Sequence, residues 1–388
     1  MDINEINNVN EKYMKMAIEE AKKGMGYTSP NPMVGCVIVK DGKVLEKACH
    51  ERYGEYHAER NALLRCKEDV KDATLYVTLE PCCHTGKTPP CTDIIIEKGI
   101  KKVYVGCLDV NPLVAGKGIQ KLKDNGIEVV SGILEKECEE LNEIFNFYIK
   151  NKFPFVAVKY AMTLDGKIAT KINDSKWITN GKSRNYVHGL RKKYSAILVG
   201  INTVLSDDPM LNCRIEENVD PVRIILDSNL RIPVDSNIVK TAKDIKTYVV
   251  MEKSVEKLYN DKIECLEKAG INIMKCAEKN GHIDLEELLK NLGEIKIDSV
   301  LVEGGSNVIK SFLDNGFVNR IYAFIAPKLT IGDDGIGPVA GCGIKDMKDS
   351  LVLKDVEMKR FDDDIMITGG LNVYRDNWRI RKNKWYYI

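Results

Sequence analysis

One histidine, one glutamate and two cysteines have the residue types and spacing of a catalytic metal site. His57-Ala58-Glu59 opens a segment in which Ala58, Ala62 and Cys66 recur every four residues, which predicts a helix. Cys82 and Cys91 lie in a second segment, between a predicted strand and a predicted helix. A catalytic zinc ion takes three protein ligands and keeps its fourth position for water. We therefore predict that His57, Cys82 and Cys91 bind Zn²⁺.

The chemistry of such a site assigns Glu59 the catalytic role. A thiol at a helix N-terminus has a lowered pKa, which favours the metal-binding thiolate. Zinc lowers the pKa of bound water to about 7, and Glu59, beside the metal but not bound to it, would move the proton. Two alternatives stay open: a structural zinc with Cys83 or His84 as fourth ligand, and redox chemistry at Cys82-Cys83. Four other cysteines of this half are expected in the core: Cys36, Cys49, Cys66 and Cys107.

The elements that must position these residues alternate between helix and strand. Helices are predicted at 13–23, 57–67 and 140–150, and strands at 33–39, 73–80, 101–109 and 127–132. Asp41-Gly42 predicts a hairpin after the first strand. Pro154 disfavours helix in the residue before it, so residues 151–154 are interpreted as a linker between domains 1–150 and 151–388. This order predicts an α/β fold in each half.

The first half resembles a known enzyme family. H-x-E followed by P-C-x-x-C is typical of zinc deaminases, and here eight residues, 83–90, separate the two cysteines. That long form, with Asn31–Gly35, Asp109–Pro112 and Val114–Gly118, resembles the deaminase half of the bifunctional riboflavin biosynthesis deaminase-reductases. The resemblance implies a cytidine-deaminase-like three-layer α/β/α domain. Its substrate pocket would be lined by Asn31, His50, Lys87, Asp109 and Asn111, each of which is otherwise a turn former or surface residue. Cys83 and Val110 replace the family's usual serine and proline.

The second half contains no GxGxxG motif, so a Rossmann nucleotide site is not supported. Strands are predicted at 155–162, 195–200, 221–228, 246–251, 299–305 and 320–327. Residues 302–307 (VEGGSN) end one strand and open a helix near Val308, where glycines and free N–H groups suit a phosphate. A double-glycine turn alone is weak evidence for such a site.

Further motifs make this half resemble the reductase half of the same family, up to about Gly369. They are Lys159–Lys167, Ser175–Thr179, Asp207–Pro209 and Ala326–Lys328, with Thr163 in place of a frequent serine. The resemblance implies a dihydrofolate-reductase-like fold. NADPH would be held by Ala161, Trp177, Thr203, Asp207, Ser228, Gly305, Ser306 and Asn307, and substrate by Ser175, Arg191, Leu211, Arg214 and Glu303. Arg191 and Arg214 suit a sugar phosphate, although surface charge is an equal alternative for each.

Composition and charge narrow the classes of protein to which this chain can belong. The chain of 388 residues has a net charge of +1, so clustered positive charge for nucleic acid is not expected. No apolar run is long enough for a membrane span, no secretory signal opens the chain, and twelve cysteines suit zinc ligation in the cytoplasm. Residues 371–388 are basic and aromatic, and a packed terminal element is preferred over a nucleic-acid arm. We expect a homo-oligomer.

The resemblance implies two successive reactions. The first is hydrolytic loss of the C2 amino group from 2,5-diamino-6-ribosylamino-4(3H)-pyrimidinone 5′-phosphate. The second is NADPH-dependent reduction of the ribosyl group of 5-amino-6-(5-phosphoribosylamino)uracil to ribityl. The rival hypotheses are a tRNA or nucleoside deaminase fused to an unrelated reductase, and a zinc-stabilised RNA-binding regulator. The intact residues His57, Glu59, Cys82 and Cys91 argue against the second rival.

Overall fold

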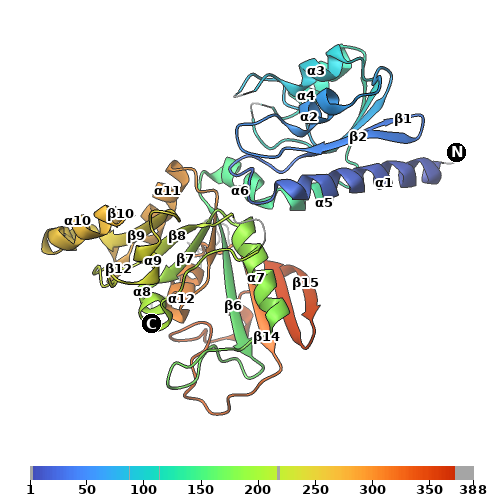
Figure 1. Ribbon diagram of the computed structural model, residues 1–388. Coiled ribbons are helices and arrows are strands. Elements are labelled where there is room, and N and C mark those ends of the chain that lie inside the picture. The colour runs from blue at the N-terminus through green and yellow to red at the C-terminus, as the bar shows by residue number, and fades with distance from the viewer. Residues whose placement is uncertain (1–2, 87, 113, 216–218, 372–388) are drawn as a thin grey trace. The chain divides into compact units, whose positions relative to one another are not determined.

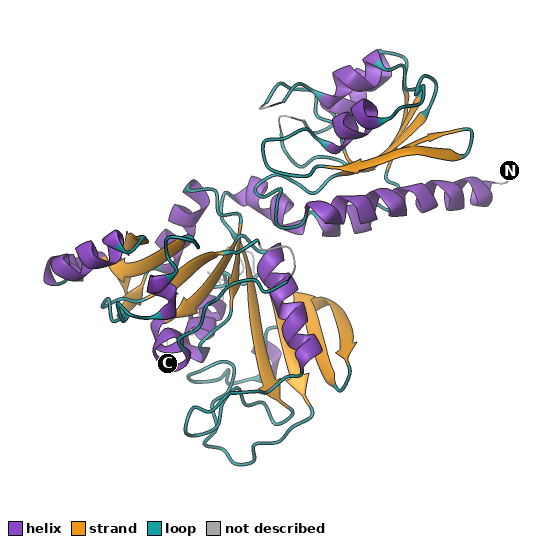
Figure 2. Ribbon diagram, viewed as in Figure 1, coloured by secondary structure: helices purple, strands orange, loops and turns teal. Residues whose placement is uncertain are grey.

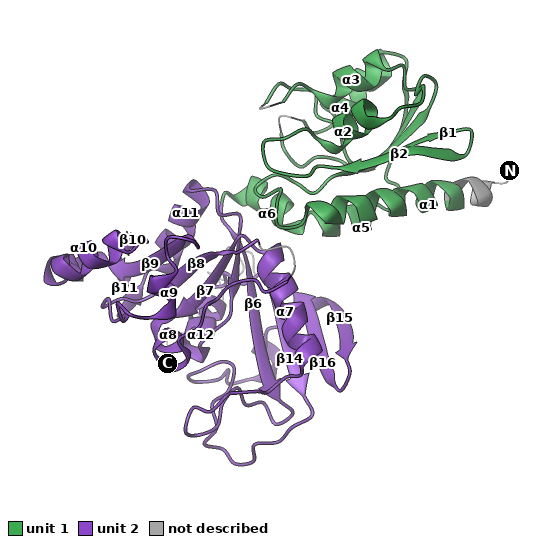
Figure 3. Ribbon diagram, in the orientation of Figure 1, with its two compact units in different colours: residues 1–152 green, residues 153–388 purple. Residues whose placement is uncertain are grey.

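The computed structural model describes residues 3–86, 88–112, 114–215 and 219–371 (Figure 1). The chain forms two compact units, Met1–Lys152 and Phe153–Ile388 (Figure 3). Lys87, a predicted substrate contact, lies outside the described residues. So do residues 372–388 of the predicted terminal extension. None of the helices in the described ranges is long and apolar enough to cross a membrane.

The first unit is built on a sheet with the strand order β2-β1-β3-β4-β5. The predicted hairpin turn is confirmed, because Asp41 and Gly42 both have positive φ values and join β1 to β2. β1 is antiparallel to β2 and β3, whereas β3, β4 and β5 run parallel. The strands are β1 (Gly35–Lys40), β2 (Lys43–Cys49), β3 (Thr74–Leu79), β4 (Lys102–Cys107) and β5 (Glu128–Ser131).

Helices cover both faces of this sheet, so the unit has three layers, as predicted (Figure 2). α1 (Ile3–Ala21) and α5 (Glu135–Leu141) lie on one face. The opposite face carries α2 (Ala58–Arg65), α3 (Cys91–Glu97) and α4 (Lys117–Asp124). The unit also contains α6 (Glu143–Asn151) and the short 3-10 helix η1 (Lys22–Gly24). The sheet's apolar residues are buried from both sides, which fixes the strand ends that carry the first site.

Two helix predictions for this unit were wrong at their boundaries. The first helix begins at Ile3 rather than Tyr13, because polar residues continue the helical turn before the packed segment around Met14. The closing helix predicted over 140–150 is instead two helices, α5 and α6. Asn142 separates them, since its buried side chain accepts a hydrogen bond from Met33 N and donates one to Met33 O. A tertiary contact therefore interrupts a segment that is locally helical.

The second unit contains a nine-stranded sheet with the order β10-β9-β8-β7-β13-β6-β14-β16-β15. The strands from β10 to β14 are parallel, and β16 and β15 add antiparallel strands at one edge. All six predicted strands are present. The parallel strands are β6 (Phe155–Thr163), β7 (Ala196–Gly200), β8 (Val222–Leu226), β9 (Thr247–Glu252), β10 (Ile271–Cys276), β13 (Ser299–Val302) and β14 (Arg320–Ala326). The edge strands are β15 (Lys354–Phe361) and β16 (Asp364–Gly370).

Two apolar clusters place the helices of this unit on the two faces of the sheet. α11 (Leu285–Glu294) and α12 (Ser306–Asp314) bury their apolar residues on one face. α8 (Ile201–Asp207), α9 (Asn237–Lys240) and α10 (Asn260–Lys268) cover the other. The remaining elements are α7 (Gly181–Lys193), the hairpin strands β11 (Glu278–Lys279) and β12 (His282–Ile283), and the 3-10 helices η2 (Lys253–Leu258) and η3 (Met347–Asp349). Parallel strands bring their carboxyl ends to one edge, which is where α/β folds bind ligands.

Candidate active sites

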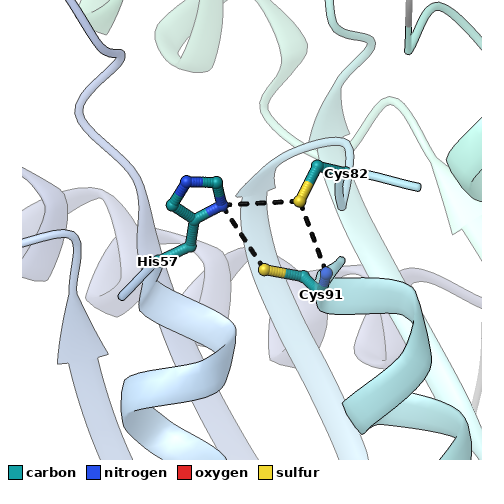
Figure 4. A group of neighbouring side chains, drawn as sticks. All are labelled: His57, Cys82 and Cys91. Carbon is teal, nitrogen blue, oxygen red and sulfur yellow. Dashed lines mark hydrogen bonds between the residues drawn. The ribbon is translucent and has the colours of Figure 1, made fainter. Parts of the chain in front are cut away.

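The structure brings His57, Cys82 and Cys91 together in the first unit (Figure 4). His57 is the N-cap residue of α2, Cys82 follows β3, and Cys91 is the first residue of α3. His57 Nδ1 lies 3.5 Å from Cys82 Sγ and 3.5 Å from Cys91 Sγ. The backbone N–H of Cys91 donates to Cys82 Sγ over 3.3 Å. Three element ends therefore direct one imidazole and two sulfur atoms at a common point.

This arrangement fits a zinc ion. The ligand atoms of the three residues lie within 4.8 Å of one another. Zn–N and Zn–S bonds at a tetrahedral angle place nitrogen and sulfur about 3.6 Å apart, close to the observed 3.5 Å. Neither Cys83 nor His84 belongs to this group in the described part of the chain, so a fourth protein ligand is not supported. The three-ligand set suits a catalytic zinc.

The thiols of Cys82 and Cys91 are coupled by a hydrogen bond. The hydrogen bond from Cys91 and the nearby His57 together lower the pKa of Cys82 to about 4, despite the opposing effect of burial. The same hydrogen bond and burial raise the pKa of Cys91. Cys82 is thus a thiolate at neutral pH, and a cation between the sulfur atoms would favour the second thiolate as well.

Glu59 lies beside these ligands on the first turn of α2. Its side chain is buried, and Oε2 has no hydrogen-bond partner among the described residues. Burial raises the pKa of Glu59 to about 7, although the charge of His57 opposes the shift. A carboxyl group with a pKa near neutrality can both accept and return a proton. Glu59 therefore has the properties of a general acid-base.

A cavity of about 240 Å³ opens over this cluster, and Glu59 and His57 form part of its wall. Four residues predicted to bind substrate also line it: Asn31, His50, Asp109 and Asn111. His50 Nδ1 lies 3.0 Å from Tyr56 O, and its Nε2 lies 3.3 Å from Asn31 Nδ2. With the proton on Nδ1, His50 donates to the carbonyl and accepts from the amide. Burial lowers the pKa of His50, in keeping with a neutral ring.

Asp109 and Asn111 follow β4 and form one turn. Asn111 N donates to Asp109 Oδ1 over 2.8 Å. Burial raises the pKa of Asp109 to about 6. The carboxyl group therefore begins to take up protons only slightly below neutral pH, and as a carboxylate it can accept hydrogen bonds from the amino groups of a pyrimidine.

The second unit contains a larger cavity, of about 1100 Å³, at the carboxyl ends of its parallel strands. β13 ends at Val302, and the turn through Gly304 and Gly305 leads into α12. Gly304 has a φ of 121°, which favours glycine. Gly305 is the N-cap residue and makes no side-chain cap, so it leaves the first N–H groups of α12 available to a phosphate. The cavity and this turn fit a phosphorylated dinucleotide.

Most residues predicted to hold NADPH line this cavity. They are Ala161, Thr203, Asp207, Ser228, Gly305, Ser306 and Asn307. Trp177 is not in the cavity lining; its ring is exposed and stacks against the Arg184 guanidinium, 4.6 Å from the ring centroid. The structure therefore gathers the predicted cofactor residues in one cavity, apart from Trp177.

The predicted substrate residues of this unit fall into two groups. Ser175 and Glu303 line the cavity, whereas Arg191, Leu211 and Arg214 do not. Leu211 is buried in the core. The two arginines meet at one residue, because Arg191 Nη1 donates to Asn212 O (3.0 Å) and Arg214 Nε donates to Asn212 Oδ1 (3.1 Å).

Comparison with known proteins then decides the family. The cytidine and deoxycytidylate deaminase zinc-binding region matches residues 7–107, and the RibD C-terminal domain matches residues 154–367. The riboflavin biosynthesis protein RibD of Actinobacillus pleuropneumoniae is 49% identical over 355 residues, covering 92% of this chain and 93% of that protein. Its counterpart from Aquifex aeolicus is 44% identical, covering 93% and 98%. This chain belongs to the RibD family.

A solved structure agrees with this assignment. The diaminohydroxyphosphoribosylaminopyrimidine deaminase/5-amino-6-(5-phosphoribosylamino)uracil reductase from Thermotoga maritima is 41% identical, with a TM-score of 0.82 and coverage of 94% of this chain and 99% of that one. The predicted fold class, a deaminase-like unit followed by a reductase-like unit, is confirmed. The chain is a bifunctional enzyme of riboflavin biosynthesis that uses Zn²⁺ and NADPH. The rival interpretations as a tRNA deaminase fusion or an RNA-binding regulator are therefore wrong.

Sequence reasoning missed two residues that belong to these RibD family sites. Glu80 and Lys159 line the first and second cavities, respectively. Lys159 interrupts the apolar strand FVAVKYAM, and a lysine inside a buried strand is a signal for a buried charge partner. Its partner is Glu303, with Lys159 Nζ 3.6 Å from Glu303 Oε2. Glu80 gave no such signal, because acidic residues are common at the ends of strands.

Proposed function

We propose that residues 1–150 deaminate 2,5-diamino-6-ribosylamino-4(3H)-pyrimidinone 5′-phosphate and that residues 151–388 reduce the product. The observation that carries this proposal is one cavity lined by the metal ligands His57 and Cys82, by Glu59 and by polar residues that can bind a pyrimidine. The Thermotoga maritima enzyme named above, similar over both units, is named for these two activities. The family assignment gives the reaction classes, and the polar residues that line the cavities would bind the substrates.

For deamination, His57, Cys82 and Cys91 would hold Zn²⁺, which when bound supplies a nucleophile at neutral pH by lowering the pKa of water. Glu59 would accept a proton from water on its free Oε2 and pass it to the ring nitrogen. It would then move a second proton, from the newly added hydroxyl group, to the amino group, which leaves as ammonia. The C2–O bond forms first, and the bond between C2 and the amino nitrogen then breaks as the C2 carbonyl forms. Asp109 and Asn111 accept and donate hydrogen bonds at the pyrimidine edge, and Asn31 and His50 orient it from the other wall.

For reduction, NADPH would lie across the cavity, with its phosphates at the N-terminus of α12 and contacts to Thr203, Asp207 and Ser228. A hydride is added to C1′ of the ribosyl group as the ring C1′–O4′ bond breaks, and O4′ takes up a proton. Ser175 and Glu303 would contact the sugar from the cavity wall, and Arg214, beside Asn212, would bind the 5′-phosphate. Holding the two reactants in one cavity supplies much of the rate by orientation alone.

We further propose that the enzyme acts in the cytoplasm as a homo-oligomer and binds no nucleic acid. All twelve cysteines are free thiols, which supports a reducing compartment. β15 is an edge strand whose residues 354–360 are exposed, and an unpaired strand edge of this length supports pairing with a second copy. The net charge of +1 supports the absence of a nucleic-acid surface. Light scattering of the purified protein, with and without added RNA, tests the oligomeric state and the absence of nucleic-acid binding.

The decisive experiment for the activities is incubation of the purified enzyme with the diaminopyrimidinone substrate. Ammonia release is expected without NADPH, and oxidation of added NADPH is expected only after deamination has begun. Supplying the deaminated compound directly should allow NADPH oxidation with no ammonia. NADPH oxidation without prior ammonia release from the first substrate would overturn the proposed order, and no ammonia under any condition would overturn the deaminase assignment.

A further inference from the structure

Glu80 is a buried carboxylate at the floor of the deaminase cavity, directly after β3. Its side chain accepts four hydrogen bonds from backbone N–H groups of one distant segment. Oε2 accepts from Asp109 N (3.4 Å) and Gly116 N (2.8 Å), and Oε1 accepts from Gly118 N (2.9 Å) and Ile119 N (3.2 Å). A single side chain thus holds both ends of the segment 109–119, of which all residues but 113 are described.

This segment has two tasks. Its first residues, Asp109 and Asn111, line the cavity, and its last residues begin α4. Gly116 is the N-cap residue of α4, has a φ of 81° and supplies no side-chain cap. The first N–H groups of α4 need acceptors from elsewhere, and Glu80 provides them. A negative charge at the helix N-terminus is also favoured by the helix dipole.

The same residue connects the segment to the metal ligands. Glu80 precedes Cys82 by two residues, and its backbone N–H donates to Cys107 O (3.0 Å) at the end of β4. A Cβ atom at Gly118 would lie 2.0 Å from Pro81 O, so the segment packs directly on the backbone between Glu80 and Cys82. The position of Asp109 and Asn111 relative to the metal site therefore depends on this contact.

Glu80 and Glu59, two buried carboxylates of the cavity, differ in how many of their oxygen atoms already accept hydrogen bonds. Both oxygens of Glu80 are occupied by N–H donors, whereas Glu59 Oε2 has no partner among the described residues. A carboxylate that accepts four hydrogen bonds is fixed in place and is poorly suited to proton transfer. Glu80 is thus distinguished from the acid-base residue by its contacts.

We propose that Glu80 is a positioning residue for deamination, which sets the distance between the pyrimidine-binding turn at Asp109 and Asn111 and the metal site. The proposal rests on the deaminase function assigned above, and it adds a residue that acts through the 109–119 segment rather than on the substrate. Substrate affinity should depend on Glu80, whereas the chemical step at a bound substrate should depend on Glu59.

Glu80→Gln tests this with little change in volume. The amide keeps one acceptor oxygen, but its NH₂ group faces two N–H donors, so one end of the segment must move. We expect the KM for deamination to rise at least about tenfold, a loss typical of charged hydrogen bonds, with kcat within about threefold. Zinc content and reduction of separately supplied deaminated substrate should stay unchanged. Glu80→Asp, which keeps the charge on a shorter chain, should restore part of the affinity.

A matched control and a thermodynamic cycle separate positioning from general destabilisation. Asp124→Asn makes the same carboxylate-to-amide change at an exposed residue of α4, which accepts a hydrogen bond from Gln120, and it should leave KM unchanged. In an Asn111→Ala background, Glu80→Gln should add little further loss, because both changes act on the same contact. The proposal would be overturned if the KM increases of the two changes multiplied in the double variant. It would also be overturned if Glu80→Gln lost zinc and kcat together.

Hydrogen exchange provides a readout that does not depend on the substrate's identity. The amides of Gly116, Gly118 and Ile119 should exchange at least about tenfold faster in Glu80→Gln, while amides of β1 keep their rates. Unchanged exchange at these three amides would overturn the proposal even if no ammonia were released. If instead exchange rises but the wild-type enzyme releases no ammonia, the positioning contact stands and the proposed substrate fails.

Discussion

Arg191 donates two hydrogen bonds to Glu303, from Nε to Oε1 over 2.8 Å and from Nη2 to Oε2 over 2.9 Å. Lys159 Nζ lies 3.6 Å from the same carboxylate. All three side chains are largely buried. Burial raises the pKa of Glu303, but the charges of Arg191 and Lys159 outweigh this effect and lower that pKa to about 2. Glu303 therefore remains ionised in the folded reductase unit at every ordinary pH.

Glu303→Gln should destabilise the reductase unit by about 3 to 5 kcal/mol, because it leaves two buried cations without their anion. Urea unfolding of the variant, followed by the fluorescence of its reductase unit, measures the change. Glu256→Gln is the matched control, since it removes a carboxylate from an exposed pair with Lys275 and should cost less than about 1 kcal/mol. Equal stability of the two variants would contradict the assigned role of the buried network.

The pH dependence of this contribution has a definite sign. The pKa of Glu303 is about 2 in the folded protein and near 4.5 when unperturbed. The stabilisation, about 3 kcal/mol, is complete above pH 4.5 and is lost as the pH falls from 4.5 towards 2. The stability difference between wild type and Glu303→Gln should shrink over that range, and a constant difference would show that the charge is not its origin.

Arg214 is predicted to make reduction depend on the substrate's 5′-phosphate. Arg191 is committed to Glu303 and Asn212, so the exposed Arg214 beside it is the better-placed phosphate ligand. Arg214→Ala should raise the KM for the phosphorylated substrate about tenfold and leave the KM for the dephosphorylated compound unchanged. Arg360→Ala, on exposed β15, serves as the control. Equal effects of Arg214→Ala on both substrates would show that the arginine serves another purpose.

Zinc binding should depend on Cys91 and not on Cys83. Cys91→Ser replaces a soft thiolate with a hard hydroxyl group, which is a poor zinc ligand, so bound zinc should fall well below one ion per chain. Cys83→Ser changes the neighbouring cysteine of the same segment and should retain full zinc, since Cys83 is not among the ligands that the structure brings together. Elemental analysis of both variants gives the answer. Full zinc in Cys91→Ser would refute the ligand set.

The zinc cluster was predictable because H-x-E and a long form of P-C-x-x-C are typical of zinc deaminases, and because both motifs lie where strands end and helices begin. His57 is the N-cap residue of α2 and Cys91 is the first residue of α3, each where the apolar periodicity changes. The six strands predicted in the second half were likewise visible as short apolar runs. A local sequence pattern thus predicts a helix or strand and the residues near which it begins and ends.

Contacts between distant segments were not predictable in this way. Arg191 and Glu303 are 112 residues apart and meet through α7 and the end of β13. Asn142 breaks a locally favourable helix because of its bonds to Met33, 109 residues earlier. The hydrogen bonds of Glu80 with the start of α4 depend on the parallel pairing of β3 and β4. Predicting each of these contacts requires knowing which segments pack or pair with one another, and local sequence patterns do not reveal this.

Separate catalysis by the two units is the last prediction, and it starts from Glu59. Glu59→Gln keeps the size of the side chain and leaves His57, Cys82 and Cys91 in place, but it removes the group that accepts the proton. Ammonia release should fall by at least about 10², the contribution expected of general acid-base catalysis. Zinc content should remain near one ion per chain, because Glu59 is not a ligand.

NADPH oxidation by the same variant, measured on separately supplied deaminated substrate, should equal that of wild type. Every residue of the larger cavity lies beyond residue 158, whereas Glu59 belongs to a cavity lined by residues 31–145. Asn61→Ala, which removes another buried side chain of α2, controls for general damage to the first unit. If Glu59→Gln abolished both activities while zinc and fold remained intact, the two sites would be chemically coupled and the separation into two catalytic units would be wrong.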